Sequence, residues 1–398
     1  MFKVTFSFED GSMVETFANA GDNLLEVARS ANVAIDAPCS GNGACGKCRV
    51  QLKSGELESK KTLHISDEEY QAGWRLSCCS KISADVNVLV PDIASAYKSR
   101  MKVADLSSKE EIAIFENAKS DIQLAGIELK NSLEVVDVLM DVPSLDDTMP
   151  DNERLTRALR KYLNINRVRI PYVVLKKLPD VLRENNFAVK CVIRATSDDM
   201  YVYDIFGKDE DVVIGGLAID IGTTTVSAVL INMENGEILA KSSAGNGQIR
   251  FGADVINRIV ESQKPGGQKK LQDAVIKETI NPMIHEMCKS AKFPKDHIYR
   301  MCVASNTTMN HLFAGINADP LRTEPYIPAF FKTNSLFASD VGVDINKDAH
   351  IIMAPNIGSY VGGDITAGTL VSQIWNRPEF SLFIDLGTNG ELVFGNSD

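Results

Sequence analysis

The sequence lacks three features that would each place it in a different class of protein. It has no apolar run of the roughly 20 residues that a membrane-spanning helix needs, so we expect no membrane partner. Its formal net charge is −11, which argues against nucleic acid as a partner. No secretory signal pattern is evident, so we expect a cytoplasmic protein whose cysteines do not form disulfides.

Four of the eight cysteines are spaced as ligands of an iron–sulfur cluster. Cys39, Cys45 and Cys48 form a C-x5-C-x2-C pattern in a glycine-rich loop, and Cys78 follows in the sequence R-L-S-C. Two bridged irons need four thiolates, and the glycines let the backbone N–H groups of the loop approach the sulfurs. The pattern therefore predicts a [2Fe–2S] cluster held by these four metal ligands.

Two alternatives to this ligand set stay open. Cys79 competes with Cys78 for the fourth position, although the long first gap and the R-L-x-C pattern resemble adrenodoxin-type and putidaredoxin-type ferredoxins, and this favours Cys78. A structural zinc site would prefer two C-x2-C pairs, and only one is present. We therefore expect an electron-transfer domain.

The residues around the cysteine loop predict a small β-grasp domain over residues 1–92. Val4, Phe6 and Phe8 alternate with polar residues, as in a half-buried strand. Asp22 is a plausible N-cap for a helix, and a closing strand is expected at residues 86–90. Residues 93–131 are expected to form a helical linker, and residues 132–208 a small α/β domain with no recognisable chemistry.

Two later segments share one pattern, in which an apolar strand ends in Asp and a Gly-Thr turn leads into a returning strand. The first spans residues 217–225 with Asp220, and the second spans residues 382–391 with Asp385. The backbone and hydroxyls of such turns can cradle phosphate oxygens, while the Asp reaches Mg²⁺ or its water. One such hairpin is weak evidence, but its recurrence argues against two ordinary β-turns.

The pair of hairpins resembles the two phosphate motifs of the superfamily of acetate and sugar kinases, seventy-kilodalton heat-shock chaperones and actin. The resemblance implies a partial actin-like (ribonuclease H-like) ATPase domain over residues 209–398, with a connecting helix at 357–370 and a strand end entering a helix at 305–311. It also implies that ATP and Mg²⁺ bind at a defined set of residues. These are Asp220, Gly222, Thr223, Thr224, Thr225, Gly363, Asp364, Asp385, Gly387, Thr388, Asn389 and Gly390. No catalytic side chain can be named.

The whole order of regions resembles the reductive activators of corrinoid-dependent enzymes, and the fold class expected is a multidomain α/β and α+β protein. The resemblance implies ATP-dependent transfer of one electron from the cluster to Co(II), giving Co(I). It implies two partners, a corrinoid protein of a methyltransferase system and an upstream low-potential electron donor, and it leaves a homodimer open. Family members continue beyond the second hairpin, whereas this sequence stops at Asp398, so we expect a fragment with little ATP affinity of its own.

Two other functions compete with this one. The chain could be a plain [2Fe–2S] electron carrier whose nucleotide-fold region is a docking module. It could also be a kinase gated by a redox sensor, but no substrate pocket can be identified in the sequence to support that. The presence of both Asp220 and Asp385 in phosphate-type turns favours the activator.

Overall fold

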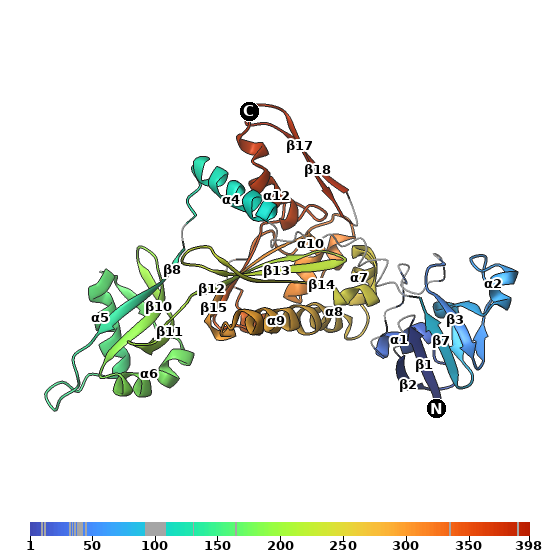
Figure 1. Ribbon diagram of the computed structural model, residues 1–398, viewed down its shortest axis with the longest axis horizontal. Coiled ribbons are helices and arrows are strands. Elements are labelled where there is room, and N and C mark those ends of the chain that lie inside the picture. Colours follow the sequence, from blue (N-terminus) through green and yellow to red (C-terminus); the bar gives the residue numbers. More distant parts are fainter. Residues whose placement is uncertain are drawn as a thin grey trace.

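The computed structural model describes most of the chain and leaves short gaps. The described residues are 1–8, 11, 13–31, 33, 35, 37, 43, 46–91, 109–129, 131–163, 165–333, 336–387 and 390–398. They form an N-terminal domain, a middle domain and a C-terminal domain, and the C-terminal domain lies between the other two (Figure 1). None of the described helices is long and apolar enough to cross a bilayer.

The N-terminal domain is a β-grasp fold, as predicted. Its elements are β1 (Phe2–Phe8), β2 (Met13–Ala18), α1 (Leu24–Ser30), β3 (Arg49–Ser54), β4 (Leu57–Ser59), α2 (Asp67–Gln71), β5 (Trp74–Leu76), η1 (Ser77–Cys79), β6 (Ser80–Ile82) and β7 (Val86–Val90). The main sheet has the order β2-β1-β7-β3-β5, and β1 and β7 pair in parallel. Val4, Phe6, Leu24 and Leu25 are buried and pack α1 against this sheet.

The helix α1 begins one residue later than expected. Its N-cap is Asn23, whose side-chain oxygen accepts hydrogen bonds from the backbone N–H groups of Leu25 (3.0 Å) and Glu26 (3.4 Å). Asp22 instead accepts a hydrogen bond from the N–H of Asn19 (2.8 Å) in the preceding turn. The predicted N-cap was therefore wrong, because the Asp22 carboxylate is already engaged on the other side.

The expected helical linker is described only from residue 109 on. Helix α4 (Lys109–Leu124) is the described part, and residues 92–108 lie outside the described residues. Helix α4 contacts α12 (Gly363–Ser372) of the C-terminal domain (Figure 1).

The middle domain packs two helices on a four-stranded sheet. Its elements are β8 (Leu133–Leu139), α5 (Asp151–Leu163), β9 (Arg167–Arg169), α6 (Tyr172–Glu184), β10 (Ala188–Ala195) and β11 (Asp199–Gly207), and the strand order is β8-β10-β11-β9. Leu155 and Leu159 of α5 and Val174, Leu178 and Leu182 of α6 are fully buried, as the helical spacing of these apolar residues requires.

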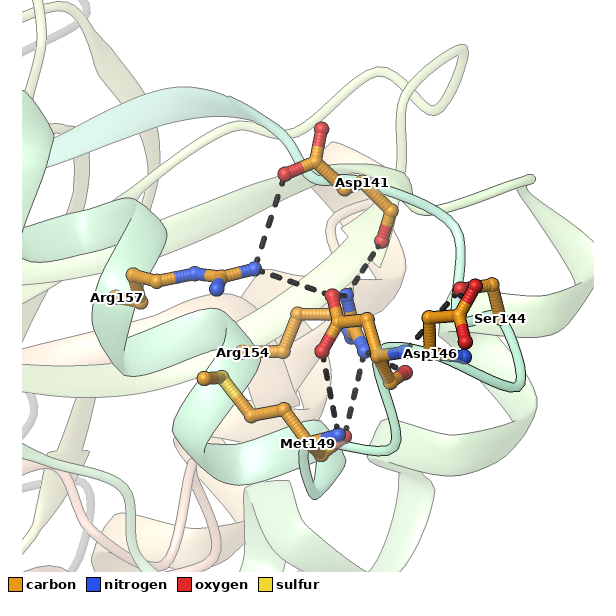
Figure 2. Close-up of polar contacts among 7 residues, drawn as sticks. Asp141, Ser144, Asp146, Met149, Arg154 and Arg157 are labelled. Atoms are coloured by element: carbon orange, nitrogen blue, oxygen red, sulfur yellow. Dashed lines mark hydrogen bonds and ion pairs between the residues drawn. The ribbon is translucent and has the colours of Figure 1, made fainter.

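A buried arginine holds the long loop between β8 and α5. The side chain of Arg154 donates to the carbonyl oxygen of Asp141 (2.9 Å) and to the carboxylate of Asp147 (2.7 Å). Figure 2 shows the loop from Asp141 to Met149 folded around this guanidinium. The Arg154 guanidinium holds the pKa of the Asp147 carboxyl below its usual range.

The C-terminal domain is built on a five-stranded sheet of order β14-β13-β12-β15-β16. Its strands are β12 (Gly215–Ile221), β13 (Thr225–Asn232), β14 (Ile238–Gly245), β15 (Ile298–Ser305) and β16 (His350–Met353). The first three are antiparallel, whereas β15 runs parallel to β12 and β16 parallel to β15. Strands β17 (Ser381–Leu386) and β18 (Gly390–Gly395) form a separate hairpin.

Helices surround this sheet. The helical elements are η2 (Gly247–Phe251), α7 (Val255–Ser262), α8 (Gly267–Val275), the π-helical η3 (Ile276–Ile280), α9 (Asn281–Ala291), η4 (Lys295–His297), α10 (Thr307–Ala314), η5 (Asp319–Leu321), α11 (Ala338–Val341), α12 and η6 (Ile374–Asn376). Residues of α8, α9 and α10 share one apolar core with β12, β13 and β15. This arrangement confirms the predicted ribonuclease H-like fold class.

The predicted connecting helix is shorter than expected. Helix α12 begins at Gly363, and residues 358–361 form bends in place of the first turn. A Cβ on Gly362 would lie 2.4 Å from Cα of Asn306 and 2.6 Å from the carbonyl oxygen of Ser305. The segment before Gly363 is therefore pressed against the start of α10, which leaves no room for a helical turn with side chains.

An aromatic core joins the middle domain to the C-terminal domain. Tyr203 and Phe206 of β11 pack with Ile214 and with Tyr299 of β15, all buried. The Tyr299 hydroxyl donates to the buried carboxylate of Asp204 (3.3 Å), which raises the pKa of Tyr299 together with burial. The two domains therefore share a packed interface rather than a solvated hinge.

Candidate phosphate and cluster sites

The first hairpin forms a tight turn between β12 and β13. The N–H of Gly222 donates to the carbonyl oxygen of Thr225 (2.9 Å), and a Cβ on Gly222 would lie 2.8 Å from that oxygen. Glycine is therefore required at this position. The Thr223 hydroxyl accepts a hydrogen bond from the side-chain amide of Asn306 (3.2 Å), which links the turn to the N-cap of α10.

The carbonyl groups of this turn are held from behind by two residues that the sequence did not single out. The side chain of Asn246 donates to the carbonyl oxygen of Gly222 (2.9 Å), and its backbone N–H donates to that of Thr224 (2.8 Å). The Nη2 atom of Arg258 donates to the carbonyl oxygen of Thr223. All three carbonyls are thus tied to the protein.

Arg258 is a buried cation without an ion-pair partner among the described residues. Its Nε donates to the carbonyl oxygen of Gly252 (2.8 Å) and its Nη1 to the side-chain oxygen of Gln248 (3.2 Å). Burial lowers the pKa of Arg258 to about 9, and the nearby charge of Asp254 partly opposes this. At neutral pH the guanidinium is still charged, so a positive charge stands directly behind the phosphate turn.

The second hairpin is described in its two strands and in part of its turn. Asp385 of β17 pairs with Glu391 of β18 in the antiparallel register, and Gly387 and Gly390 flank the turn. The predicted phosphate ligands Thr388 and Asn389 lie outside the described residues, so their role stays a prediction.

Four carboxylates of the two hairpins and α12 influence one another electrostatically. The pKa of Asp220 is raised to about 6, first because surrounding protein atoms remove part of its hydration and then because of the charges of Asp364 and Asp385. Asp220 is exposed to water, yet nearby protein atoms still remove part of the hydration of its carboxylate. Desolvation also raises the pKa of Asp364 and of Glu391, and the charge of Asp385 adds to both shifts.

These carboxylates do not form a ready-made metal cage. Among the described residues, no group of three His, Cys, Asp or Glu side chains lies close enough to hold a metal ion. A magnesium ion in a nucleotide site usually needs only one or two carboxylates, because phosphates and water complete its shell. Burial raises the pKa of Asp220, and the charges of Asp364 and Asp385 add to this rise, so Asp220 and Asp364 are carboxylates that a nearby Mg²⁺ would stabilise in their ionised form.

Gly363, one of the predicted nucleotide-binding residues, also has a packing role. A Cβ on Gly363 would lie 2.5 Å from the carbonyl oxygen of Ala354. The glycine therefore allows α12 to pack closely on the strand end, and its neighbour Asp364 supplies the charge near Asp220. Its direct contact with a nucleotide stays a prediction.

Cys48 and Cys78 are the two predicted cluster ligands that the structure describes. Their sulfur atoms lie 3.1 Å apart, and Cys48 is buried. The hydrogen bond between the two thiols lowers the pKa of Cys48 to about 6, and together with burial it raises the pKa of Cys78. Thiolate ligands of one cluster must converge in this way. Cys39 and Cys45 lie outside the described residues.

Cys79 remains close to the same place. Its sulfur lies 3.6 Å from that of Cys78, and a Cβ on Gly43 of the cysteine loop would lie 3.3 Å from it. The 3.1 Å contact between the sulfurs of Cys48 and Cys78 is consistent with Cys78 as the fourth ligand, and the choice over Cys79 stays a prediction. The donor set fits a [2Fe–2S] cluster, because thiolates from the loop and from η1 meet at one point.

The middle domain has two surface hollows, and neither is lined by the predicted cluster or phosphate residues. One is lined by residues of α5, β9 and the β10–β11 turn, among them Arg160, Arg167 and Asp199. Another lies beside Arg154 and Tyr162. Neither contains a residue of the hairpins or the cysteine set, so we assign no chemistry to them.

Three family models match consecutive parts of the chain. They are the 2Fe-2S iron-sulfur cluster binding domain at residues 7–83, the RACo linker region at 122–212 and the RACo middle region at 215–377. Together with the fold, they define a multidomain protein in which a [2Fe–2S] ferredoxin domain precedes a linker domain and a ribonuclease H-like domain. From here on we call them the ferredoxin domain, the middle domain (the RACo linker region) and the nucleotide domain (the RACo middle region, named for its predicted phosphate hairpins).

Similar proteins include activators of corrinoid enzymes. The chain is 28% identical over 377 residues to the corrinoid activation enzyme RamQ of Eubacterium limosum, covering 94% of this chain and 56% of RamQ. It matches the solved structure of a reductive activator for corrinoid, iron-sulfur protein with a TM-score of 0.60 and 33% identity, covering 100% of this chain and 62% of that one. The predicted resemblance to the reductive activators is confirmed.

The ferredoxin domain also has relatives of its own. It is 35% identical over 91 residues to a component of the Na(+)-translocating NADH-quinone reductase of Actinobacillus succinogenes, a match that covers 22% of each chain. The chain spans between half and two thirds of the length of RamQ and of the solved activator.

Proposed function

We propose that the protein performs ATP-dependent reductive activation of a corrinoid protein. In this reaction the ferredoxin domain passes one electron to the Co(II) corrinoid of the partner, which becomes Co(I). One observation carries the proposal. This chain, which is similar to corrinoid activators, contains both a cluster-type cysteine set and two phosphate-type hairpins whose carboxylates interact electrostatically.

The need for ATP follows from redox energetics. A bound [2Fe–2S] cluster supplies a one-electron carrier, with a potential of about −400 mV in plant-type ferredoxins. The resemblance places the Co(II)/Co(I) couple below this value, and about 59 mV changes a one-electron equilibrium tenfold. Transfer without assistance would therefore favour Co(II), and energy from a nucleotide site would have to shift the equilibrium.

The residues of the chain divide the work between two sites. Cys48 and Cys78, with Cys39 and Cys45, would hold the cluster. The turn at Gly222–Thr225 would hold phosphate oxygens through its backbone and hydroxyls, while Asp220 and Asp364 hold Mg²⁺ or its water. Holding Mg²⁺ requires ionised carboxylates, so nucleotide binding should weaken as the pH falls through about 6, the raised pKa of Asp220.

The test is a measurement of Co(I) formation. The protein, with its cluster reconstituted, is mixed anaerobically with a Co(II) corrinoid protein and titanium(III) citrate, with and without Mg-ATP. We expect the Co(I) absorbance to rise only when ATP is present. An equal rise without ATP would contradict the proposal and favour a plain electron carrier.

Matched cysteine variants test the ligand assignment in the same assay. Cys78→Ser should lose the [2Fe–2S] spectrum and the Co(I) signal, whereas Cys79→Ser should keep both. The two residues are adjacent, so any general effect of removing a thiol beside the loop is shared. The reverse result would assign the fourth ligand to Cys79.

A further inference from the structure

The ferredoxin domain contacts the nucleotide domain through a buried arginine. Nε of Arg29, in α1, donates to the carbonyl oxygen of Arg250, in η2, at 3.2 Å, although the two residues are 221 positions apart. The side chain of Arg29 is only 5% exposed, and its Nη1 forms an ion pair with Glu26 (2.7 Å). A buried arginine needs polar partners, and the carbonyl of Arg250 supplies one from the other domain, whereas Nη2 of Arg29 has none among the described residues.

The element on the nucleotide side is fixed to the phosphate turn. Asn246, which ties the carbonyls of Gly222 and Thr224, also caps η2 by accepting a hydrogen bond from the N–H of Gln248 (3.0 Å). Arg258 donates to the carbonyl oxygen of Thr223 in the turn and to that of Gly252, the residue that follows η2. A shift of the turn would therefore move η2 with it.

Two further contacts attach η2 to the π-helical η3. They restrict the directions in which η2 can move when the turn shifts. The N–H of Gly247 donates to the hydroxyl of Thr279 (3.1 Å), and Nη2 of Arg250 forms an ion pair with Glu278 (2.5 Å). Both partners belong to the π-helical η3. The carbonyl oxygen that accepts from Arg29 therefore belongs to an element, η2, that is fixed to η3.

The element on the ferredoxin side is fixed to the predicted fourth ligand. The N-cap of α1, Asn23, donates from its side-chain amide to the carbonyl oxygen of Cys78 (2.8 Å). Leu24, Leu25 and Ala28 bury α1 in the core of the domain. A displacement of α1 would therefore reach the segment that carries Cys78.

We propose that the Arg29–Arg250 contact is the docking site of the ferredoxin domain on the nucleotide domain, and that it couples the phosphate turn to the segment carrying Cys78. Every link is a hydrogen bond or a packed helix, so the two sites are physically continuous. Coupling between two ligand sites is reciprocal, so the oxidation state of the cluster would also affect affinity at the turn. Only this last point rests on the proposed function.

Docking is tested by hydrogen–deuterium exchange on the cluster-loaded, full-length protein. Arg29→Gln removes the charged donor and should speed exchange about tenfold in the peptides covering α1 and η2. Glu26→Gln is the matched control, because it breaks the ion pair of Arg29 within α1 but leaves the bond to Arg250 in place. Arg29→Gln exchange equal to wild type in both peptides would overturn the docking site.

Coupling is tested from the opposite end without any nucleotide. Asn246→Ser removes the bond to Gly222 and should speed exchange in α1, which Asn246 does not touch. Asn235→Ser is the control, since Asn235 also accepts a backbone N–H, that of Glu237 (2.8 Å), but at the distant end of β13. Unchanged α1 exchange in Asn246→Ser, with faster exchange in η2, would overturn the coupling.

Nucleotide then separates this inference from the proposed function. A non-hydrolysable Mg-ATP analogue should change α1 exchange in wild type and Glu26→Gln, and leave it unchanged in Arg29→Gln. If calorimetry shows that the analogue does not bind, the ATP part of the proposed function fails, while the results for Arg29→Gln and Asn246→Ser still decide docking and coupling.

Discussion

At the scale of the residue, the carboxylate of Asp220 lowers the stability of the fold at neutral pH, and it is also a predicted Mg²⁺ ligand. Asp220 is pressed among protein atoms and faces the charges of Asp364 and Asp385, which raise its pKa to about 6. An acid with a raised pKa binds its proton more tightly in the folded chain than in the unfolded chain. Its contribution to stability therefore declines as the pH rises from about 4 to 6 and stays low at pH 7.

Asp220→Asn should stabilise the protein while damaging its nucleotide site. At pH 7 we expect a gain in the free energy of unfolding of the order of 1 kcal/mol, a value reduced for the exposure of Asp220 to water. The gain should vanish below about pH 3, where the wild-type carboxyl is protonated in both states. Urea unfolding at the two pH values measures this.

The same variant should lose affinity for Mg-ATP, because an amide is a poor ligand for Mg²⁺. Asp340→Asn is a suitable control, since the carboxylate of Asp340 accepts a hydrogen bond from the N–H of Phe337 at the start of α11 and belongs to neither hairpin. Loss of stability in Asp220→Asn at pH 7 would contradict the electrostatic account of this residue.

At the scale of elements, the turn at Gly222–Thr225 depends on helix α7, which belongs to neither hairpin. Helix α7 places Arg258 behind the turn, where one guanidinium serves carbonyl groups from residues 223 and 252 and the side chain of Gln248. A neutral side chain would leave these acceptors buried without donors. Removing one partner of a buried polar contact usually costs more than the contact contributes.

Arg258→Met should weaken nucleotide binding beyond its effect on stability. We expect a loss of about 3 kcal/mol in the free energy of unfolding, and about tenfold weaker binding of a Mg-ATP analogue under conditions where the variant is folded. Calorimetry and urea unfolding measure the two effects.

Arg154→Met is the matched control, because Arg154 is also a buried arginine that holds carbonyl groups, but in the middle domain (Figure 2). It should lose comparable stability and keep its nucleotide affinity. Equal affinity in both variants would show that Arg258 has only a structural role.

The sequence reveals elements and motifs where the signal is local. The cysteine spacing, the strand–Asp–Gly-Thr hairpins and the helices with apolar stripes are short patterns, and they predicted the fold class. Asn246 and Arg258 could not be found this way, because their partners are backbone carbonyls far along the chain, which leave no side-chain signature. The late start of α12 depends on the close approach of Gly362 to Asn306, which is a tertiary contact.

At the scale of the whole molecule, the middle domain is attached by packing. Tyr203 of β11 is fully buried. Its ring contacts the ring of Tyr299 in β15 edge-on, with 6.0 Å between the centroids. Its hydroxyl is buried without a hydrogen-bond partner among the described residues. The ring therefore stabilises the junction, while the hydroxyl weakens it.

Two substitutions at Tyr203 should have opposite effects. Tyr203→Ala should lower the free energy of unfolding by about 3 kcal/mol, whereas Tyr203→Phe should leave it unchanged or raise it by up to about 1 kcal/mol. Urea unfolding followed by circular dichroism measures both. Tyr172→Ala is the control, because Tyr172 is 73% exposed and its loss should change stability by less than about 0.5 kcal/mol.

The parallel pairing of β1 with β7 has a consequence for how the protein is made. Because Phe8 pairs with Val90, the first sheet is complete once the ribosome has released residue 90. The later sheet must wait much longer, since Ile219 of β12 pairs with Val303 of β15, and Cys302 of β15 with Ile352 of β16. Iron and sulfide can therefore be delivered to a finished ferredoxin domain while the nucleotide domain is still being translated.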